Sequence, residues 1–448
     1  MGKDKINVIM LTMKQILILI GISMLALASC KSVTEPDRPN IILILSDDQS
    51  WTDYSFMGHE HIQTPRLDQL AAEGLTITNS YTTAPLCRPA LVSIVTGLYS
   101  YQHKILGNDP VFPFPDKQGN RNAWMEKRGE ENQSNVDAVE ALPTLPDLLG
   151  ELGYLSLQTG KWWEGHFSVG GFTEGMTHGD PSRGGRHGDA GLKIGREGMD
   201  IIYDFIDEST AGDSPFFIWY APFLPHAPHT PPDSLLNKYL TKTPSKAVAK
   251  YWAMCEWFDI TCGQLMDYVE EKGLSENTLF IYVTDNGWIQ DPDRANRYAS
   301  RSKQAPYDMG IRTPIMYRWK GKIAPEMDTV SLSSSVDIAT TILSVCGLEP
   351  TAEMQGIDVL DKEERSSREA VFAEVYQHDF QEIESSLKHR AIISKPWKLI
   401  LTSPAYKPEL GPELYNLALD PFEWDNKADE NPAIVEQLAG EIDKWWNK

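Results

Sequence analysis

The chain has 448 residues, of which 41% are hydrophobic and 23% are charged, and its formal net charge is −22. Because this length exceeds one ordinary hydrophobic core, we expect one large domain and one smaller domain. The acidic balance excludes a nucleic-acid-binding surface, which requires a basic footprint. An anionic substrate therefore needs a local cluster of basic side chains, since the field of the whole molecule repels it.

Residues 1–30 have the pattern of a bacterial lipoprotein signal peptide. Three lysines precede an apolar run at residues 16–28. This run is too short for a typical transmembrane helix. Cys30 follows in a sequence that resembles a lipobox, where the signal is cleaved before the cysteine and the cysteine carries lipid. We expect an exported lipoprotein, anchored to a membrane in the periplasm or at the outer membrane, with residues 31–38 as a linker. The alternative is a plain signal peptide with an incidental cysteine.

Two apolar runs, at residues 41–45 and 278–284, predict strands that are buried on both faces of a sheet. Each run ends in acidic or amide side chains, at the strand end where α/β sheets place their sites. Neighbouring carboxylates repel one another unless a cation holds them. A set of oxygen ligands suits Ca²⁺ or Mg²⁺ rather than Zn²⁺. The oxygen-bearing residues are Asp47, Asp48, Asp285 and Asn286.

Cys87 stands just before a proline and an apolar run that ends in glycine. Pro89 fits the first turn of a helix, and the apolar residues after it recur at helical spacing. We therefore expect Cys87 at the start of a buried helix. Unpaired backbone N–H groups there favour negative charge by roughly 0.3–1 kcal/mol at exposed sites, so a nucleophile or an anion fits the position. A buried structural cysteine is the alternative, since free cysteines are often buried.

Basic groups follow or precede other predicted strands. Lys161 comes directly after one strand, and Lys303 lies before another. His226 stands between two prolines after a third strand, where a fixed imidazole is a candidate general acid or base. Together with the oxygen ligands and a nucleophile at a helix start, these groups predict a site for a tetrahedral oxyanion.

Apolar periodicity places the remaining elements. We expect helices at residues 64–74, 143–152, 198–210, 245–272 and 334–346, and further strands at residues 154–159, 215–221 and 315–319. Strands alternating with helices indicate an α/β fold, with a mostly parallel central sheet flanked by helices, over residues 39–364. Short strands and a closing helix predict a small antiparallel α+β subdomain over residues 365–448.

Two stretches interrupt this pattern. Residues 107–140 are polar and show little periodicity, so we expect an insertion or a surface loop there. Residues 165–198 are rich in glycine and contain His166 and His187. That stretch is a candidate substrate-binding lid, and an ordinary solvated loop is the alternative.

Six short motifs occur in order along residues 38–448. They are Pro39-Asn40-Ile41-Ile42 with Asp47-Asp48; Cys87-Arg88-Pro89 with Thr96-Gly97; Gly160-Lys161-Trp162; Pro225-His226-Ala227-Pro228; Thr284-Asp285-Asn286-Gly287; and Lys303 with Tyr307 and Gly310-Ile311-Arg312-Thr313-Pro314. Each motif is weak alone, but in this order they resemble the type I, formylglycine-dependent sulfatases of the alkaline phosphatase superfamily. The segment 413–417 is similar to the C-terminal signature of that family.

The resemblance implies a mechanism. A sulfatase-maturating enzyme would convert Cys87 to formylglycine, whose hydrated aldehyde is the nucleophile that attacks sulfur. Lys161 and Lys303 would hold the sulfate oxygens, and His226, alone or with Lys303, would protonate the leaving alcohol. The residues that would hold Ca²⁺, or alternatively Mg²⁺, beside the nucleophile are Asp47, Asp48, Asp285, Asn286 and Cys87.

The sequence departs from the family pattern at two positions. Leu91 stands where the family has an arginine that helps both maturation and the stability of the hydrate, and Trp163 stands where the family has a histidine base. Loss of a positioned base typically costs on the order of 10²–10⁴-fold in rate. Arg88 is a candidate to replace the missing charge, and His166 or His187 to replace the base. We also expect Trp163 and these two histidines to contact the substrate.

Three functions fit the sequence. The first is a sulfatase that acts on a sulfated glycan. The second is a phosphodiesterase or phosphonate monoester hydrolase of the same superfamily, because one site fits both anions. The third is a non-catalytic anion-binding homologue in which Cys87 stays unmodified, an alternative that depends on the departures at Leu91 and Trp163.

Overall fold

The computed structural model describes residues 38–109, 121–179, 193–377 and 383–446. The expected signal peptide at residues 1–30 and nearly all of the expected linker lie outside these residues, so the lipoprotein anchor stays a prediction. Among the described residues, no helix is long and apolar enough to cross a membrane. Residues from Arg38 onward form one compact unit.

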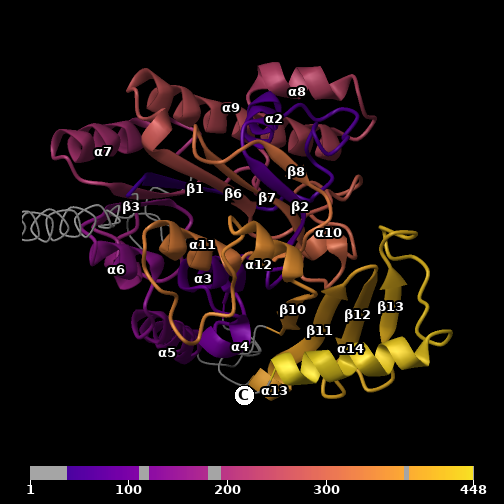
Figure 1. The fold of residues 1–448 in the computed structure, drawn as a ribbon. Helices are drawn as coiled ribbons and strands as arrows, with labels where there is room; N and C mark the ends of the chain where they lie inside the picture. The colour runs from indigo at the N-terminus through magenta and orange to yellow at the C-terminus, as the bar shows by residue number, and fades with distance from the viewer. Residues whose placement is uncertain (1–37, 110–120, 180–192, 378–382, 447–448) are drawn as a thin grey trace, which may run out of the picture. The chain divides into compact units, whose positions relative to one another are not determined.

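A nine-stranded sheet lies at the centre of this unit (Figure 1). In spatial order its strands are β4 (Glu174–Gly175), β3 (Leu155–Gly160), β5 (Phe216–Ala221), β1 (Asn40–Ser46), β6 (Thr278–Thr284), β7 (Arg312–Trp319), β2 (Leu75–Tyr81) and β8 (Glu326–Asp328), with β9 (Ser333–Ser334) paired to β2. β1 runs parallel to both of its neighbours, β5 and β6, whereas β7 runs antiparallel to β6 and β2. The predicted mostly parallel α/β sheet is confirmed.

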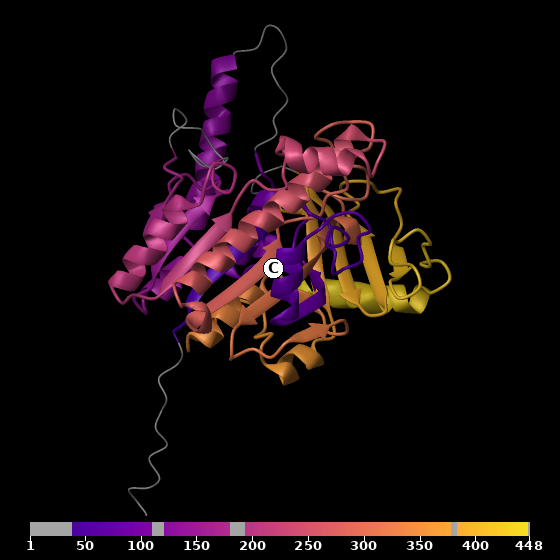
Figure 2. The same cartoon turned by 90° about the horizontal axis from the view of Figure 1, so that it is seen from above.

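Helices cover both faces of this sheet, as the alternation of side chains along β1 requires. Leu43 and Leu45 belong to the hydrophobic cluster on one face, and Ile42 and Ile44 to the cluster on the other. The helices on the first face are α3 (Cys87–Thr96), α6 (Leu145–Gly150) and α11 (Asp337–Val345). The helices on the second face are α2 (Pro65–Ala72), α7 (Asp200–Ala211) and α9 (Lys246–Glu271), as Figures 1 and 2 show.

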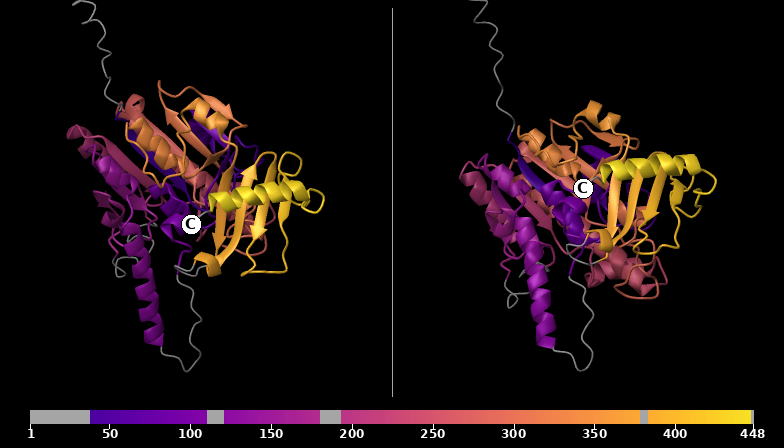
Figure 3. Two further views of the ribbon diagram at one scale, coloured as in Figure 1. Left: turned by 60° about the horizontal axis from the view of Figure 1, so that its bottom comes forward. Right: turned by 90° about the horizontal axis from the view of Figure 1, so that it is seen from below.

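A second, antiparallel sheet follows near the C-terminus. Its strands are β10 (Val371–Tyr376), β11 (Leu387–Ser394), β12 (Trp397–Thr402) and β13 (Glu413–Asn416), and α14 (Pro432–Trp445) lies across one face, as Figure 3 shows. Leu438 and Ile442 of α14 pack on Ile392 and Leu399 of the sheet. The predicted small antiparallel subdomain is confirmed, while its predicted boundary at residue 365 falls within a short helix.

The structure also contains elements that periodicity did not predict. The remaining helices are α4 (Ser100–His103), α5 (Arg121–Glu140), α8 (Asp233–Leu240), α10 (Asp308–Ile311), α12 (Lys362–Ser367) and α13 (Ile383–Ser386). The expectation of a surface loop over residues 107–140 is wrong for α5. This helix is polar on nearly all sides and buries only Asn135, Val136 and Val139, so it has no apolar stripe to reveal it.

Lys398 on β12 joins the two sheets through a buried cluster of charges. Its Nζ lies 2.8 Å from Asp308 Oδ1 on α10 and 2.7 Å from Glu423 Oε1, and all three side chains are at most 1% exposed. The backbone N–H of Asp308 donates to Glu423 Oε2 at 2.7 Å. One ammonium group therefore contacts two carboxylates away from water, and Arg312 Nη1 lies 3.7 Å from the other oxygen of Asp308.

Replacement of Lys398 by methionine should leave the buried Glu423 without its cation. Asp308 would keep only the more distant Arg312, whose Nη1 lies 3.7 Å from Asp308 Oδ2. We expect Lys398→Met to lower the free energy of unfolding by about 3–5 kcal/mol, measured by urea denaturation. Lys427→Met is the matched control, because that lysine also pairs with two acidic residues, but at the surface. Equal, small effects of the two variants would mean that the buried cluster does not stabilise the fold.

Candidate active site

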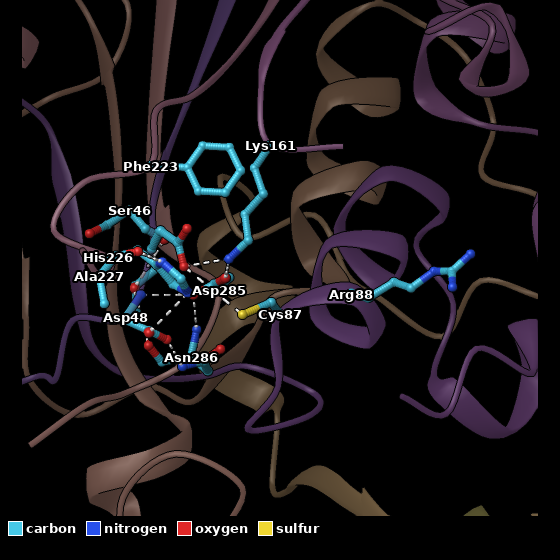
Figure 4. A network of polar contacts seen from close by, with 12 residues as sticks. Ser46, Asp48, Cys87, Arg88, Lys161, Phe223, His226, Ala227, Asp285 and Asn286 are labelled. Atoms are coloured by element: carbon cyan, nitrogen blue, oxygen red, sulfur yellow. Dashed lines mark hydrogen bonds and ion pairs between the residues drawn. The ribbon is translucent and has the colours of Figure 1, made fainter. Parts of the chain in front are cut away.

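Four oxygen-bearing side chains meet where β1 and β6 end. The two strands are adjacent and parallel, so Asp47 and Asp48 after β1 lie beside Asp285 and Asn286 after β6. The backbone N–H of Asp48 donates to Asp285 Oδ1 at 3.1 Å, and Asn286 Nδ2 donates to Asp48 Oδ1 at 2.7 Å (Figure 4). The structure thus brings together the residues that the sequence predicts as metal ligands.

Cys87 lies at the first position of α3 and is 1% exposed. Its Sγ is 3.0 Å from Lys303 Nζ and 4.0 Å from Asp47 Oδ1. Burial raises the pKa of the Cys87 thiol to about 12, although Lys161 and Lys303 act in the opposite direction. The unmodified thiol is therefore not an activated nucleophile, since the thiolate is the reactive form.

Two buried lysines supply the positive charge of the site. Lys161 Nζ contacts Asp47 Oδ1 and lies 3.0 Å from Asp285 Oδ2, and Lys303 Nζ contacts Asp48 Oδ1. Burial alone would lower the pKa of each lysine, but the surrounding acidic groups raise the pKa of both above the ordinary value. Both side chains are therefore cations.

His226 closes one side of this cluster. Its Nδ1 lies within hydrogen-bond distance of the Ala227 carbonyl and donates to it, which leaves the Nε2 lone pair toward the site, 3.6 Å from Asp48 Oδ2. Asp47, Cys87 and His226 offer atoms that lie within 4.8 Å of one another. Burial lowers the pKa of His226 to about 3 despite the opposing effect of Asp48, so the imidazole is neutral.

Three oxygens of the cluster are buried and have no hydrogen-bond partner among the described residues: Asp47 Oδ2, Asp48 Oδ2 and Asn286 Oδ1. Buried polar atoms are almost always paired, so these oxygens indicate a missing partner. Burial raises the pKa of Asp47, and the neighbouring Asp285 and Asp48 raise it further against the effect of Lys161. The donor set fits a hard divalent cation, and the predicted acidic metal site is supported.

The two departures from the family pattern lie in one hydrophobic cluster. Leu91 and Trp163 are 4% and 5% exposed, and both belong to the cluster that contains Cys87. Lys161 Nζ lies 5.0 Å from the centre of the Trp163 ring, which is within the range of a cation–π contact. Apolar side chains thus stand in place of the arginine and histidine of the family pattern, and one of them, Trp163, contacts Lys161.

Arg88 does not take the place of the missing arginine. Its side chain extends away from the Cys87 sulfur, as Figure 4 shows. The guanidinium forms a bidentate ion pair with the buried Glu164, with Nε 2.7 Å from Oε1, and Nη1 lies 3.1 Å from Asn132 Oδ1. The expectation that Arg88 adds charge beside the nucleophile is corrected: a nearby carboxylate already compensates this charge.

The structure gives no support to His166 as the replacement base. Its Nδ1 is 2.8 Å from Ser168 Oγ, and its ring packs against Phe167 and His178, outside the group of Asp47, Cys87 and His226. His187 lies outside the described residues.

Arg196 supports the active site by holding the segment of His226, a role that the sequence did not reveal. Its Nη2 donates to the carbonyls of Phe223 and His226 at 2.6 and 3.3 Å, and its Nη1 donates to Thr230 Oγ1 at 3.0 Å. Arg196 therefore holds the segment that carries His226. A single arginine in a glycine-rich stretch has no motif, so only its position in space identifies this contact.

Cation binding at the orphaned oxygens should stabilise the protein. We expect Ca²⁺ at a hundred times its dissociation constant to add about 2.7 kcal/mol to the stability of chelator-treated protein and to raise the midpoint of thermal unfolding. Asn286→Leu should abolish this shift. Asp53→Asn should retain it, because Asp53 is a buried carboxyl outside the cluster, bonded to Ser50 and Tyr251. A shift that survives in Asn286→Leu would contradict the assignment.

The buried ion pair predicts that Arg88 and Glu164 act on stability and depend on each other. Glu164→Gln should lower the free energy of unfolding by about 3–5 kcal/mol, because it leaves a buried guanidinium without its counter-charge. Arg88→Met combined with Glu164→Gln should lose clearly less than the sum of the single variants in a double-mutant cycle. Additive losses would argue against the pair.

Comparisons with known proteins agree with this geometry. The sulfatase family model matches residues 39–348, and the C-terminal model of N-sulphoglucosamine sulphohydrolase matches residues 298–448. The chain is 27% identical to dog N-acetylgalactosamine-6-sulfatase over 377 residues, which cover 75% of the chain and 68% of the relative. It is 23% identical to the N-acetylgalactosamine-6-O-sulfatase of Bacteroides thetaiotaomicron, covering 90% and 92%.

Solved structures share the fold. The structure of Ps i-CgsB in complex with k-i-k-neocarrahexaose superposes with a TM-score of 0.71 at 21% identity, over 91% of this chain and 93% of that one. Several mammalian relatives are longer, and the chain spans about two thirds of their length. Because the family model covers more than half of the residues and its matched region contains the whole predicted site, the chain belongs to the sulfatase family, and the predicted sulfuric ester hydrolase is confirmed at that level.

Proposed function

We propose that this protein hydrolyses a sulfate ester of a glycan, with Cys87 converted to formylglycine and Ca²⁺ bound beside it. The observation that carries the proposal is the position of Cys87 at the start of α3, between two buried lysines and three unpartnered oxygens. Ca²⁺ fits better than Mg²⁺, because four protein side chains converge on one point, whereas Mg²⁺ usually keeps several water ligands.

The bound groups would supply two kinds of chemistry. Formylglycine at position 87 would supply a hydrated aldehyde, with one hydroxyl as the nucleophile toward sulfur and a second hydroxyl to release the sulfate. A divalent cation held by Asp47, Asp48, Asp285 and Asn286 would stabilise negative charge there. With such a cation balancing the carboxylates, the ammonium groups of Lys161 and Lys303 are available to the sulfate oxygens.

In this proposal, Lys303 and His226 carry out the two proton transfers. The resemblance implies His226, alone or with Lys303, as the proton donor to the leaving oxygen. Because the His226 proton lies on Nδ1 and is donated to the Ala227 carbonyl, we assign this step to Lys303, whose Nζ lies 3.0 Å from the Cys87 sulfur. His226 keeps its proton on Nδ1 for the Ala227 carbonyl, so its Nε2 is placed to accept a proton from the second hydroxyl. His226 would thus perform the step that the family pattern gives to a histidine at the position of Trp163.

Two observations support a glycan as the substrate: the names of the relatives and the expected export of the chain. The N-acetylgalactosamine-6-sulfatases of dog and Bacteroides are named for a 6-sulfated amino sugar, which makes this sugar the first substrate to test. A lipid anchor at Cys30 would hold the enzyme at a membrane outside the cytoplasm, where saccharides are scavenged. A sulfatase-maturating enzyme is the second partner that the proposal requires.

The test combines a mass measurement with two assays on protein from a host that matures sulfatases. We expect the peptide containing Cys87 to carry an aldehyde in place of the thiol, and the protein to release sulfate from N-acetylgalactosamine 6-sulfate faster than phosphate from 4-nitrophenyl phosphate. Faster phosphate release would favour the phosphoryl hydrolase. An intact thiol with no turnover would favour the anion-binding homologue.

The assignment of His226 has its own matched control. His226→Ala should lower kcat on the order of 10²–10⁴-fold. His166→Ala should stay within about twofold of the parent, because this histidine is partly exposed and bonded to Ser168. A large loss in His166→Ala together with a small loss in His226→Ala would overturn the assignment.

A further inference from the structure

Two exposed aromatic side chains on the loop after β13 contact residues of two loops that carry active-site residues. Trp424 is 76% exposed and Phe422 is 44% exposed, in the loop that follows β13. Trp51 and Arg301 come from two other loops and contact these rings. We call these four residues the aromatic platform. Single exposed apolar residues are normal at a surface, but a group of rings beside a cation needs an explanation.

The backbone of the loop after β13 holds Phe422 and Trp424 at the surface. Between them stands Glu423, which is 1% exposed, has a φ of 60°, and is held by Lys398 and by the backbone N–H of Asp308. A non-glycine residue rarely adopts this conformation without a compensating contact. With Glu423 fixed inward, the side chains on either side of it remain at the surface.

The platform is continuous with the loops of the active site. The ring of Phe422 stacks on Trp51, with centroids 6.2 Å apart and an interplanar angle of 29°. Trp51 lies three residues after Asp48. Arg301 lies two residues before Lys303, whose Nζ contacts the Cys87 sulfur. Two short backbone connections therefore link the platform to the metal ligands and to the nucleophile.

Arg301 gives the platform a positive charge. Its guanidinium lies 3.5 Å from the centre of the Tyr307 ring and 5.0 Å from that of Trp424, and its Nη2 donates to the Glu423 carbonyl. Among the described residues, no carboxylate forms an ion pair with it. On a chain of net charge −22, an uncompensated guanidinium fixed between rings attracts an anion locally.

We propose that the aromatic platform is a subsite for a neighbouring sugar of an acidic saccharide, with Trp424 stacked on the pyranose ring and Arg301 paired with a sulfate or carboxylate of that sugar. The ring C–H groups of a sugar form an apolar face with polar hydroxyls at its edge, which suits an exposed indole beside a guanidinium. The inference rests on the proposed function and extends it: the protein would prefer an oligosaccharide to a monosaccharide.

The test compares two substrates. The probes are a chondroitin 6-sulfate tetrasaccharide and N-acetylgalactosamine 6-sulfate, assayed by sulfate release, with tetrasaccharide binding measured in parallel by calorimetry. Trp424→Ala should raise KM for the tetrasaccharide about tenfold and leave kcat within about twofold. The monosaccharide constants should not change, and Trp424→Tyr should restore most of the affinity. Arg301→Gln should raise the same KM and weaken its dependence on salt.

Leu419→Ala is the matched control, since Leu419 is 84% exposed on the same loop and outside the platform. The subsite is overturned if Trp424→Ala and Leu419→Ala behave alike, if the tetrasaccharide binds no better than the monosaccharide, or if Trp424 governs binding to anionic phospholipid vesicles instead. Trp424-dependent binding of the tetrasaccharide with no sulfate release from either probe would support the subsite and count against the proposed activity.

Discussion

The repulsion among buried carboxylates is the constraint on which the site depends. Asp47, Asp48 and Asp285 meet at the ends of two parallel strands, away from water, and such a group is stable only when cations surround it. The protein supplies two of them, Lys161 and Lys303. The oxygens that the lysines do not reach define the place for a divalent cation, so the positions of the lysines and of the metal site answer one electrostatic requirement.

The same requirement explains how the site accommodates its two departures from the family pattern. Leu91 and Trp163 remove a cation and an imidazole from the side of Cys87 and replace them with packed apolar surface. Lys161 remains beside that surface and contacts the Trp163 ring. Among the described residues, the histidine that groups with Asp47 and Cys87 is His226, on a segment that Arg196 holds through backbone carbonyls. In the proposed mechanism, one histidine and one lysine therefore carry out the proton transfers.

The small C-terminal sheet contacts the segment that carries an active-site lysine. Lys398 and Glu423 reach Asp308, in the segment that also carries Lys303, and the same Glu423 holds the loop of the aromatic platform. Burying charges costs desolvation, so such a cluster is retained only with close ion pairs and hydrogen bonds, as here. The same buried cluster thus contacts both the segment that follows Lys303 and the loop of the aromatic platform.

The sequence by itself determined the α/β architecture, the strand ends that carry Asp47, Asp48, Asp285 and Asn286, and the helix that starts at Cys87, because continuous apolar runs and turn residues encode buried strands and helix ends locally. It did not reveal α5, which has no apolar stripe, or the direction of Arg88. Only the tertiary structure decided that Arg88 pairs with Glu164, that Arg196 holds the His226 segment, and that Trp51, Arg301 and Trp424 gather in one place. These contacts join residues that are distant in the chain, and no local pattern specifies which partner a charged or aromatic side chain will meet.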